Sequence, residues 1–214
     1  MPPKLVLFDC DGVLVDTETR TSEVMARNFQ RYGLRVDATD MHSFFIGGTM
    51  MSAGQMAQDL GADLPVNWLD EISAEVNEEL AKGVDVFNGV FDLLDKLDHL
   101  EIATAVVSNG PMEKMQVSLG PCGLWDRFEG RIYSGRVLKP KPDPMMILMA
   151  IEQAKVTAEE TIMIDDTTAG TRAADAAGVR AIGFAAASDA MKLKQTGHPV
   201  AMTMSEVQSL LKLN

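Results

Sequence analysis

Short apolar runs that alternate with helical patterns are the feature that most constrains the fold of this chain. Four of these runs are apolar on both faces, as in strands buried inside a parallel sheet, and small or acidic residues follow each one. The runs lie at residues 5–8, 103–107, 161–164 and 180–183, and the helical patterns include 90–97 and 145–154. This order predicts an α/β fold with a mostly parallel sheet and helices on both of its faces.

One long segment near the N-terminus departs from this alternation. Residues 16–86 have no long β-branched run, and their apolar residues recur at helical spacing. The two apolar faces of this segment are formed by Met25, Phe29 and Tyr32, and by Trp68, Ile72, Val76 and Leu80. We therefore predict a core formed by residues 1–15 and 87–214, with residues 16–86 as an inserted helical lid. An ordinary run of surface helices is the alternative.

Two aspartates directly follow the first predicted strand, in the sequence Phe8-Asp9-Cys10-Asp11-Gly12. Ligands of open α/β sheets bind beyond the carboxyl ends of the strands, which is where these residues fall. Alternation along the chain places Asp9 and Asp11 on the same side, where two carboxylates share either a proton or a cation. Gly12 permits a sharp turn. On its own, the motif fits a calcium loop or a plain turn equally well.

A second acidic pair, Asp165-Asp166, follows the apolar run at 161–164. Adjacent acidic residues at the tip of a buried strand are costly without a counter-ion. Oxygen ligands from two strand tips suit a hard divalent cation, and Mg²⁺ is the one best matched to substrate phosphates. The sequence therefore predicts a Mg²⁺ site, although a capped helix N-terminus would also explain this pair by itself.

Two further loops are candidates for binding a phosphate. Ser108-Asn109-Gly110 follows the run at 103–107 and precedes a helix opened by Pro111, so a hydroxyl, backbone N–H groups and a helix N-terminus converge there. The loop at 139–144, Lys-Pro-Lys-Pro-Asp-Pro, can hold an ammonium group in place at little entropic cost. Taken singly, each loop is more often a turn than a site.

Together, the four segments resemble the motifs of the haloacid dehalogenase-like phosphotransferase superfamily. FDCDGVLVDTE, VVSNG, KPDP and IDDTTAG occur in the chain order of that family and at the predicted strand tips. The resemblance covers essentially the whole chain and implies a Rossmann-like sheet with a cap domain. The insertion at 16–86 is similar in position to the helical cap of the β-phosphoglucomutase-like branch.

The resemblance implies an enzyme that transfers a phosphoryl group in two steps. Asp9 would be the nucleophile that forms an aspartyl-phosphate, and Asp11 would be the general acid and base. Mg²⁺ would be held by Asp9, by the backbone carbonyl of Asp11 and by Asp166, with help from Asp165.

The resemblance also implies which residues bind the phosphate. Ser108, Asn109, Gly110 and a lysine of the third motif would hold its non-bridging oxygens. Lys139 and Lys141 both begin a K-P-x-P sequence. We choose Lys141 because its spacing to the later acidic pair matches the register of the branch.

Two departures from the mutase branch favour hydrolysis over isomerisation. Thr21 stands where the mutases have an activating histidine, and Met50 stands where they have an arginine just past the glycine loop. The glycines of that loop, Gly47 and Gly48, remain candidates for substrate binding.

The segment VVSNGPMEKMQVSLG is similar to the corresponding region of bacterial 6-phosphogluconate phosphatases. This similarity implies a phosphatase for a small sugar or sugar-acid phosphate, with 6-phosphogluconate as the first choice. Phosphoglycolate hydrolysis and a β-phosphoglucomutase-type reaction are the alternatives. Lys114 in this segment would either reach a substrate carboxylate or lie on the surface.

Composition argues against several other classes of function and partner. A net charge of −12 disfavours nucleic acid, and no run approaches the ~18 apolar residues of a membrane span. Cys10 and Cys122 form no disulfide framework, and the N-terminus lacks a secretion signal, so we predict a cytoplasmic protein. Cys10 is expected to pack inside the core. The sequence leaves the oligomeric state open, and a monomer is compatible with it.

Two functions of other classes share some of these features. A phospho-accepting receiver module also has an acidic pair and a lysine, but it has a different motif order and no helical insertion. A non-catalytic phosphate-binding module would not need every catalytic residue type, and all of them are present here.

Overall fold

The computed structural model describes residues 2–37, 41 and 50–213, and it divides the chain into two compact units. The first unit comprises the chain up to Asp16 and from Asp85 onward, and the second comprises Thr17–Val84. These bounds lie within two residues of the predicted core and insertion. The lid role of the second unit stays a prediction.

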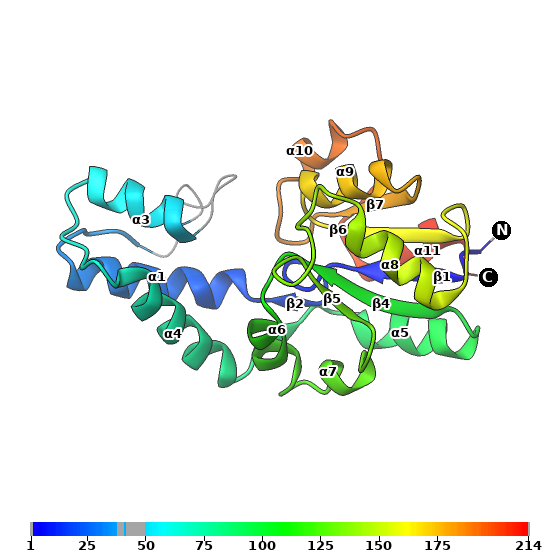
Figure 1. Ribbon diagram of the computed structural model, residues 1–214, viewed down its shortest axis with the longest axis horizontal. Helices are drawn as coiled ribbons and strands as arrows, with labels where there is room; N and C mark the ends of the chain where they lie inside the picture. Colours follow the sequence, from blue (N-terminus) through cyan, green and yellow to red (C-terminus); the bar gives the residue numbers. More distant parts are fainter. Residues whose placement is uncertain (1, 38–40, 42–49, 214) are drawn as a thin grey trace. The chain divides into compact units, whose positions relative to one another are not determined.

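A sheet of six parallel strands forms the centre of the first unit, in the order β5-β4-β1-β6-β7-β8 (Figure 1). The strands are β1 (Leu5–Phe8), β4 (Ala103–Ser108), β5 (Ile132–Ser134), β6 (Thr161–Asp165), β7 (Arg180–Phe184) and β8 (Val200–Ala201). From β1 the chain proceeds outward on one side through β4 and β5, and then crosses to the other side for β6, β7 and β8. The predicted α/β fold with a Rossmann-like parallel sheet is confirmed.

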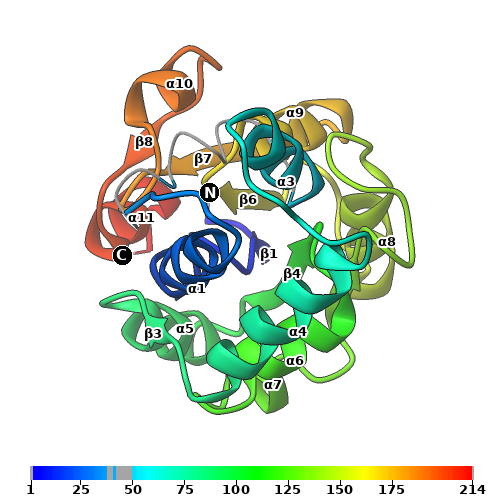
Figure 2. The same cartoon turned by 90° about the vertical axis from the view of Figure 1, so that its left-hand side faces the viewer.

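Helices cover both faces of this sheet (Figures 1 and 2). One face carries α8 (Met145–Ala154) and α9 (Thr168–Ala176), and the other carries α5 (Val90–His99) and α11 (Met204–Leu211). The other helices described in this unit are α6 (Met112–Leu119), α7 (Leu124–Arg127) and α10 (Ala190–Lys194).

The residues of β1 supply both halves of the core by simple alternation. Leu5 and Leu7 belong to an apolar cluster that includes Ile147 of α8, whereas the Phe8 ring, on the other face, lies 6.3 Å from the ring of Phe128. Every β1 side chain is at most 1% exposed. Full burial of such a side chain stabilises the fold by about 1.5–3 kcal/mol, which explains why a four-residue run is enough to specify this strand.

The register of the central strands brings their carboxyl ends to one edge of the sheet. Phe8 pairs with Val106 of β4 on one side and with Ile164 of β6 on the other. The chain order reverses next to β1, and open α/β sheets bind their ligands beyond the strand ends at such a reversal. Asp9 directly follows Phe8 and therefore lies at this position.

Two short antiparallel strands, β2 (Val15–Asp16) and β3 (Asp85–Val86), mark the start and the end of the insertion. Val15 pairs with Val86 and Asp16 pairs with Asp85. The chain therefore leaves the first unit and returns to it at neighbouring positions.

The second unit contains α1 (Glu18–Arg31), α3 (Met50–Asp59) and α4 (Trp68–Ala81). Phe29 of α1 stacks on Trp68 of α4 with ring centroids 5.6 Å apart. The indole N–H of Trp68 donates a 2.7 Å hydrogen bond to Oδ1 of the buried Asn28, whose amide donates in turn to Glu71 and Glu75. The two apolar helix faces predicted from the sequence thus pack against each other through the Phe29–Trp68 stack, and hydrogen bonds through Asn28 also link α1 to α4.

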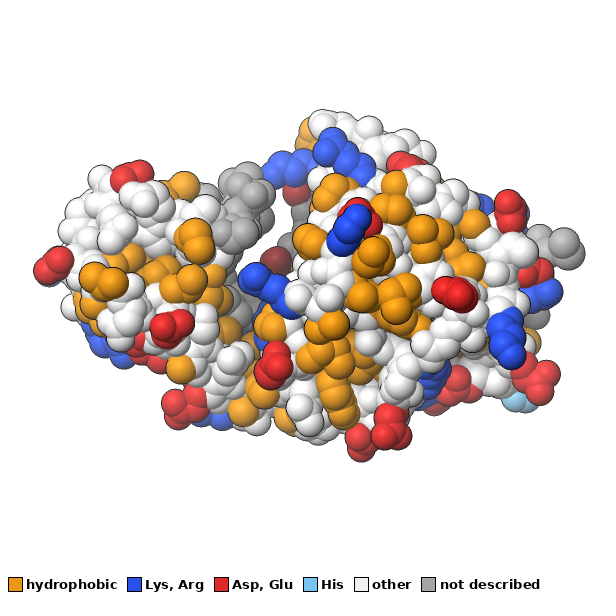
Figure 3. Space-filling model, in the orientation of Figure 1, with side chains coloured by type: hydrophobic (Ala, Val, Ile, Leu, Met, Phe, Trp, Pro, Cys, Tyr) orange, Lys and Arg blue, Asp and Glu red, His pale blue; other side chains and the backbone are white. Residues whose placement is uncertain are grey.

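The surface of the first unit that is drawn in Figure 3 mixes acidic and basic side chains with exposed apolar ones. Leu148 and Met149 of α8 are 47% and 40% exposed. Among the described residues, no helix is both long and apolar enough to cross a membrane.

Candidate active site

Three aspartates meet at the carboxyl ends of β1 and β6. Asp9 follows β1, Asp165 ends β6 and Asp166 comes next, and their exposed fractions are 6%, 0% and 8%. One carboxylate oxygen from each lies within 4.8 Å of the other two. The first and fourth sequence motifs, which are far apart in the chain, therefore form one buried acidic cluster.

Lys141 places its ammonium group among these carboxylates. Its Nζ lies 2.7 Å from Oδ2 of Asp165 and 2.8 Å from Oδ2 of Asp9, and it also donates to the Val107 carbonyl at 3.2 Å. The other candidate of the third motif, Lys139, is exposed and pairs with Asp143 at 3.7 Å. The geometry thus favours Lys141 over Lys139 as the lysine of the cluster.

The turn after β6 holds the acidic pair rigidly. The backbone N–H and the hydroxyl of Thr167 both donate to Oδ1 of Asp165, and the same hydroxyl caps α9 by accepting from the N–H of Gly170. A Cβ at position 170 would lie 1.8 Å from Cγ of Asp165, so only glycine fits there. Ser188 donates a 2.6 Å hydrogen bond to Oδ2 of Asp166, a contact that no pattern in the sequence indicates.

Gly12 is required for the same close packing. Its φ is +77°, and a Cβ at this position would lie 2.3 Å from Oδ2 of Asp166. The turn after β1 can therefore pass against the Asp166 carboxylate only with glycine at this point.

The cluster contains more acidic than basic groups, and this shifts the pKa values of its members. Burial raises the pKa of Asp9 to about 7, because desolvation and the nearby Asp165 outweigh the opposing effect of Lys141. Desolvation lowers the pKa of Lys141, but Asp165 and Asp9 raise it by more, so this lysine stays charged. Three carboxylates against one ammonium leave an excess of two negative charges when all are ionised.

A divalent cation fits this arrangement. The donor set consists of carboxylate oxygens only, which are the ligands that Mg²⁺ prefers, and the closely spaced oxygens of Asp9, Asp165 and Asp166 can share one ion. Its two positive charges would balance the excess. The Asp11 carboxylate is not part of this cluster, and the contribution predicted for this residue is its backbone carbonyl.

The loop after β4 is tied to the loop that carries Lys141. The Asn109 side chain accepts a 2.7 Å hydrogen bond from the Lys141 N–H and donates one of 3.2 Å to the Lys141 carbonyl. The predicted phosphate ligand Asn109 thus has a clear positioning contact through its amide. Its role toward phosphate stays a prediction.

Ser108 and Gly110 lie at the same edge of the sheet. Ser108 ends β4, is 2% exposed and accepts a 3.1 Å hydrogen bond from the N–H of Gly110 through its hydroxyl. Ser134, at the end of β5, donates to the Gly110 carbonyl at 2.6 Å and fixes the loop from the other side. Together these contacts hold a hydroxyl and a backbone turn beyond β4, as an anion cradle needs.

Asp11 has a partner that was not predicted from the sequence. The Lys114 ammonium, in the first turn of α6, lies 2.7 Å from Oδ2 of Asp11. Desolvation lowers the pKa of Lys114, but Asp11 raises it by more, so the lysine stays charged. Neither of the two expected roles of Lys114, at a substrate carboxylate or on the surface, included this contact.

The remaining candidates are placed as follows. Cys10 is fully buried and its thiol pKa is raised by burial, so the prediction of a packed cysteine is confirmed. Gly47 and Gly48 lie outside the described residues. Thr21 lies in α1 and Met50 begins α3, both in the second unit.

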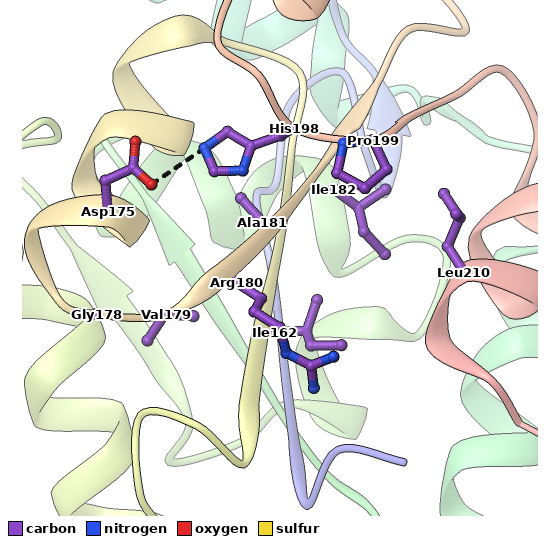
Figure 4. Close-up of a pocket in the computed structure, with 10 residues that line it drawn as sticks. All are labelled: Ile162, Asp175, Gly178, Val179, Arg180, Ala181, Ile182, His198, Pro199 and Leu210. Carbon is purple, nitrogen blue, oxygen red and sulfur yellow. Dashed lines mark ion pairs between the residues drawn. The ribbon is translucent and has the colours of Figure 1, made fainter. Parts of the chain in front are cut away.

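A hollow of about 410 Å³ lies at the amino ends of β6 and β7, at the edge of the sheet opposite to the acidic cluster (Figure 4). Ile162, Ile182 and Leu210 line it, and His198 pairs with Asp175 at 3.2 Å on its rim. Parallel α/β sheets bind ligands at their carboxyl edge. The acidic cluster, rather than this hollow, is therefore the candidate active site.

Comparison with known proteins identifies the family. The model of the family described as "Haloacid dehalogenase-like hydrolase" matches residues 6–184, which is most of the chain and includes all four motifs. The chain belongs to the haloacid dehalogenase-like hydrolases. The resemblance inferred from its motifs is thus confirmed.

Individual members of this family resemble the chain over nearly its full length. The chain is 29% identical to 6-phosphogluconate phosphatase of Escherichia coli, with 97% of this chain and 93% of that protein covered. It is also 29% identical to validoxylamine A 7'-phosphate phosphatase of Streptomyces hygroscopicus, with 90% of each covered.

Solved structures of the family share the fold. A haloacid dehalogenase-like protein from Agrobacterium tumefaciens has a TM-score of 0.86 at 27% identity, with 98% of this chain and 97% of that one covered. A hydrolase of the family from Deinococcus radiodurans, with bound phosphate and sodium, also has a TM-score of 0.86, at 25% identity and with 99% and 96% covered.

Proposed function

We propose that this protein is a Mg²⁺-dependent phosphatase that hydrolyses a small sugar or sugar-acid phosphate through an aspartyl-phosphate on Asp9. The observation that carries the proposal is the buried cluster of Asp9, Asp165 and Asp166 with Lys141 at the carboxyl edge of the sheet. The broader class, a phosphoric monoester hydrolase of this family, is shown by the family match and by the phosphatase names of its relatives.

The first step would be attack by a carboxylate oxygen of Asp9 on the phosphorus. The bond between phosphorus and the ester oxygen breaks as the new O–P bond forms, and Asp11 donates a proton to the departing oxygen. Asp9 is suited to this role because the N–H of Cys10 donates to its Oδ1 at 2.7 Å and the Lys141 ammonium contacts its Oδ2. Its carboxylate is therefore held in one orientation.

The second step would regenerate the enzyme. Asp11, now ionised, takes a proton from water, whose oxygen attacks the phosphorus and releases Asp9 and inorganic phosphate. Lys141 and the Ser108–Gly110 turn would bind the non-bridging oxygens in both steps. Mg²⁺ held by Asp9, Asp166 and the Asp11 carbonyl, with Asp165 beside them, would supply neutralisation of charge on the phosphoryl oxygens.

The substrate is proposed from the relatives. The two relatives at 29% identity are named for 6-phosphogluconate and for validoxylamine A 7'-phosphate, and a Thermotoga maritima relative at 25% identity is named "Phosphorylated carbohydrates phosphatase". The bound phosphate of the Deinococcus radiodurans hydrolase is consistent with a phosphate site in this fold. We take 6-phosphogluconate as the first candidate and the helical unit 17–84 as the lid that selects it.

The test is phosphate release from a panel of substrates with Mg²⁺ and with chelator. The panel contains 6-phosphogluconate, phosphoglycolate, hexose phosphates and p-nitrophenyl phosphate. We expect chelator-sensitive release, with the highest kcat/KM for a sugar or sugar-acid phosphate. Absence of chelator-sensitive release from every compound would overturn the proposed activity.

A variant pair tests the nucleophile. Asp9→Asn should abolish turnover and leave the fold intact, because the amide cannot attack phosphorus and keeps the shape of the carboxylate. Asp92→Asn, a matched change at an exposed position of α5, should keep full activity. An Asp9→Asn protein that turns over at the wild-type rate would exclude Asp9 as the nucleophile.

A further inference from the structure

The ion pair between Lys114 and Asp11 joins two residues that lie 103 positions apart. The side chains are 25% and 27% exposed, so the pair is largely withdrawn from water. A lysine on a protein surface gains little from such pairing, because water screens the charges and the long side chain loses rotamer freedom. Water therefore screens this pair less than it screens an ion pair between fully exposed side chains.

The position of Lys114 in its helix is electrostatically unfavourable. Pro111 is the N-cap of α6, and Lys114 is the third helical residue after it. The first turn of a helix carries a partial positive charge that favours acidic side chains and disfavours an ammonium group. Attraction to the nearby carboxylate of Asp11 offsets this cost and explains why a lysine is tolerated in the first turn.

The surrounding backbone directs Lys114 to Asp11. The Ser118 hydroxyl donates to the Lys114 carbonyl at 3.0 Å and braces the first turn of the helix. The loop before the helix runs beside Asp11, since a Cβ at Gly110 would lie 3.9 Å from Oδ2 of Asp11. The backbone around Lys114 is therefore held close to Asp11, and the lysine side chain extends to the carboxylate from a fixed position.

The two lysines of the site serve different carboxylates. Lys141 contacts Asp9 and Asp165 in the buried cluster, whereas Lys114 contacts Asp11 outside it. The residue assigned to proton transfer thus has an ion-pair partner different from the lysine that pairs with the residue assigned to nucleophilic attack.

We propose that Lys114 is a positioning residue that holds the Asp11 carboxyl group in the orientation needed to give a proton to the ester oxygen and to take one from water. Its ammonium donates to Oδ2 of Asp11, which can accept this hydrogen bond whether the carboxyl group is protonated or ionised. The inference rests on the proposed phosphatase function. Proton transfer in the transition state requires the acid within hydrogen-bond reach of the departing oxygen, and an aspartate side chain can adopt several rotamers. The ion pair selects one of them.

This role predicts a dependence on the leaving group. Alkyl phosphates need a proton on the departing oxygen, whereas p-nitrophenolate leaves without one. The ratio kcat/KM reports the steps up to departure of the leaving group, and it is therefore insensitive to the later hydrolysis of the aspartyl-phosphate.

The experiment compares Lys114→Met, Lys114→Arg and the control Glu113→Gln, which changes one exposed charge on the same turn of α6. Lys114→Met should lower kcat/KM for 6-phosphogluconate by about 10- to 100-fold, a part of the 10²–10⁴ that general acid catalysis contributes. It should lower kcat/KM for p-nitrophenyl phosphate by less than about 3-fold, because that leaving group needs no proton. Lys114→Arg should recover most of the loss, and Glu113→Gln should cause none.

Three outcomes would overturn the inference. Equal losses on both substrates would indicate a structural role, and no loss on either would show that the ion pair is dispensable. A loss confined to 6-phosphogluconate, with a hexose phosphate that lacks a carboxylate unaffected, would indicate binding of the substrate carboxylate instead. If Lys114→Met does not fold by circular dichroism, Lys114→Gln is compared in the same way. Failure of the phosphatase proposal is distinct, since the wild-type protein would then release no phosphate at all.

Discussion

Replacing Lys141 with methionine should destabilise the protein strongly in the absence of divalent cations, and adding Mg²⁺ should raise the stability of the variant. Methionine keeps much of the length and apolar character of the lysine stem but removes the ammonium group. Asp9 and Asp165 would lose contacts of 2.8 and 2.7 Å, and the Val107 carbonyl would lose its 3.2 Å donor. The lysine side chain is 2% exposed, so water cannot replace these contacts.

The magnitude follows from this burial. Removing one partner of a buried ion pair costs about 3–5 kcal/mol, because the charge that remains has no compensation. For a protein of this size, 1 kcal/mol corresponds to about 2–4 °C, so the melting temperature should fall by roughly 6–20 °C. A cation that binds only the folded state at 100 times its Kd returns about 2.7 kcal/mol. Saturating Mg²⁺ should therefore stabilise the variant, relative to the same variant in chelator, by an amount equal to about half of the loss or more.

The assay is urea and thermal unfolding of the wild-type protein and the variant, in chelator and in Mg²⁺. Lys139→Met is the matched control, since Lys139 lies in the same loop but is exposed and pairs with Asp143 at 3.7 Å. Its effect should stay within about 0.5 kcal/mol. Equal stability of the two variants in chelator would refute the reasoning, and so would an absence of any Mg²⁺ effect on Lys141→Met.

Two further predictions concern the groups that position the acidic pair. Ser188→Ala should weaken Mg²⁺ binding by about 10-fold or more, because loss of an outer partner of a ligating carboxylate typically costs 10–100-fold in affinity. The Mg²⁺ dependence of the melting temperature measures this affinity. The same midpoint Mg²⁺ concentration in the variant and the wild-type protein would contradict the prediction. Gly170→Ala should destabilise the fold by about 1–3 kcal/mol or more in urea unfolding, since its Cβ would lie 1.8 Å from Asp165. A variant as stable as the wild-type protein would show that α9 can move away from Asp165 without cost.

The sequence predicts the central strands well because their burial appears directly as short apolar runs along the chain. Each of the four predicted runs is a strand of the sheet, and the helix predicted at 145–154 is α8 within the same bounds. The signal works because both faces of these strands are covered, so apolar residues run without interruption. The edge strands β5 and β8 contain only three and two residues, too few for any pattern to be distinguished from a loop.

The site was predictable only to the extent that its residues follow strands. Asp9, Ser108 and Asp165 are brought together by strand order, which the motifs anticipate. Ser188 lies in the loop after β7, and its bond to Asp166 depends on how that loop folds back. The Lys114–Asp11 pair likewise depends on the path of one helix relative to one turn. Such contacts have no local pattern in the sequence, so they cannot be predicted from one sequence alone.

The pairing of Asp16 with Asp85 has a consequence for how such a protein can change. Because the chain leaves and re-enters the sheet unit at adjacent positions, the closure entropy of the intervening segment is nearly independent of what it contains. An insertion of another length or shape can be joined to the same two strands without altering the sheet or its acidic cluster. With the insertion proposed as the lid that selects the substrate, we expect that grafting another insertion at β2 and β3 would change the substrate preference and leave the acidic cluster in place.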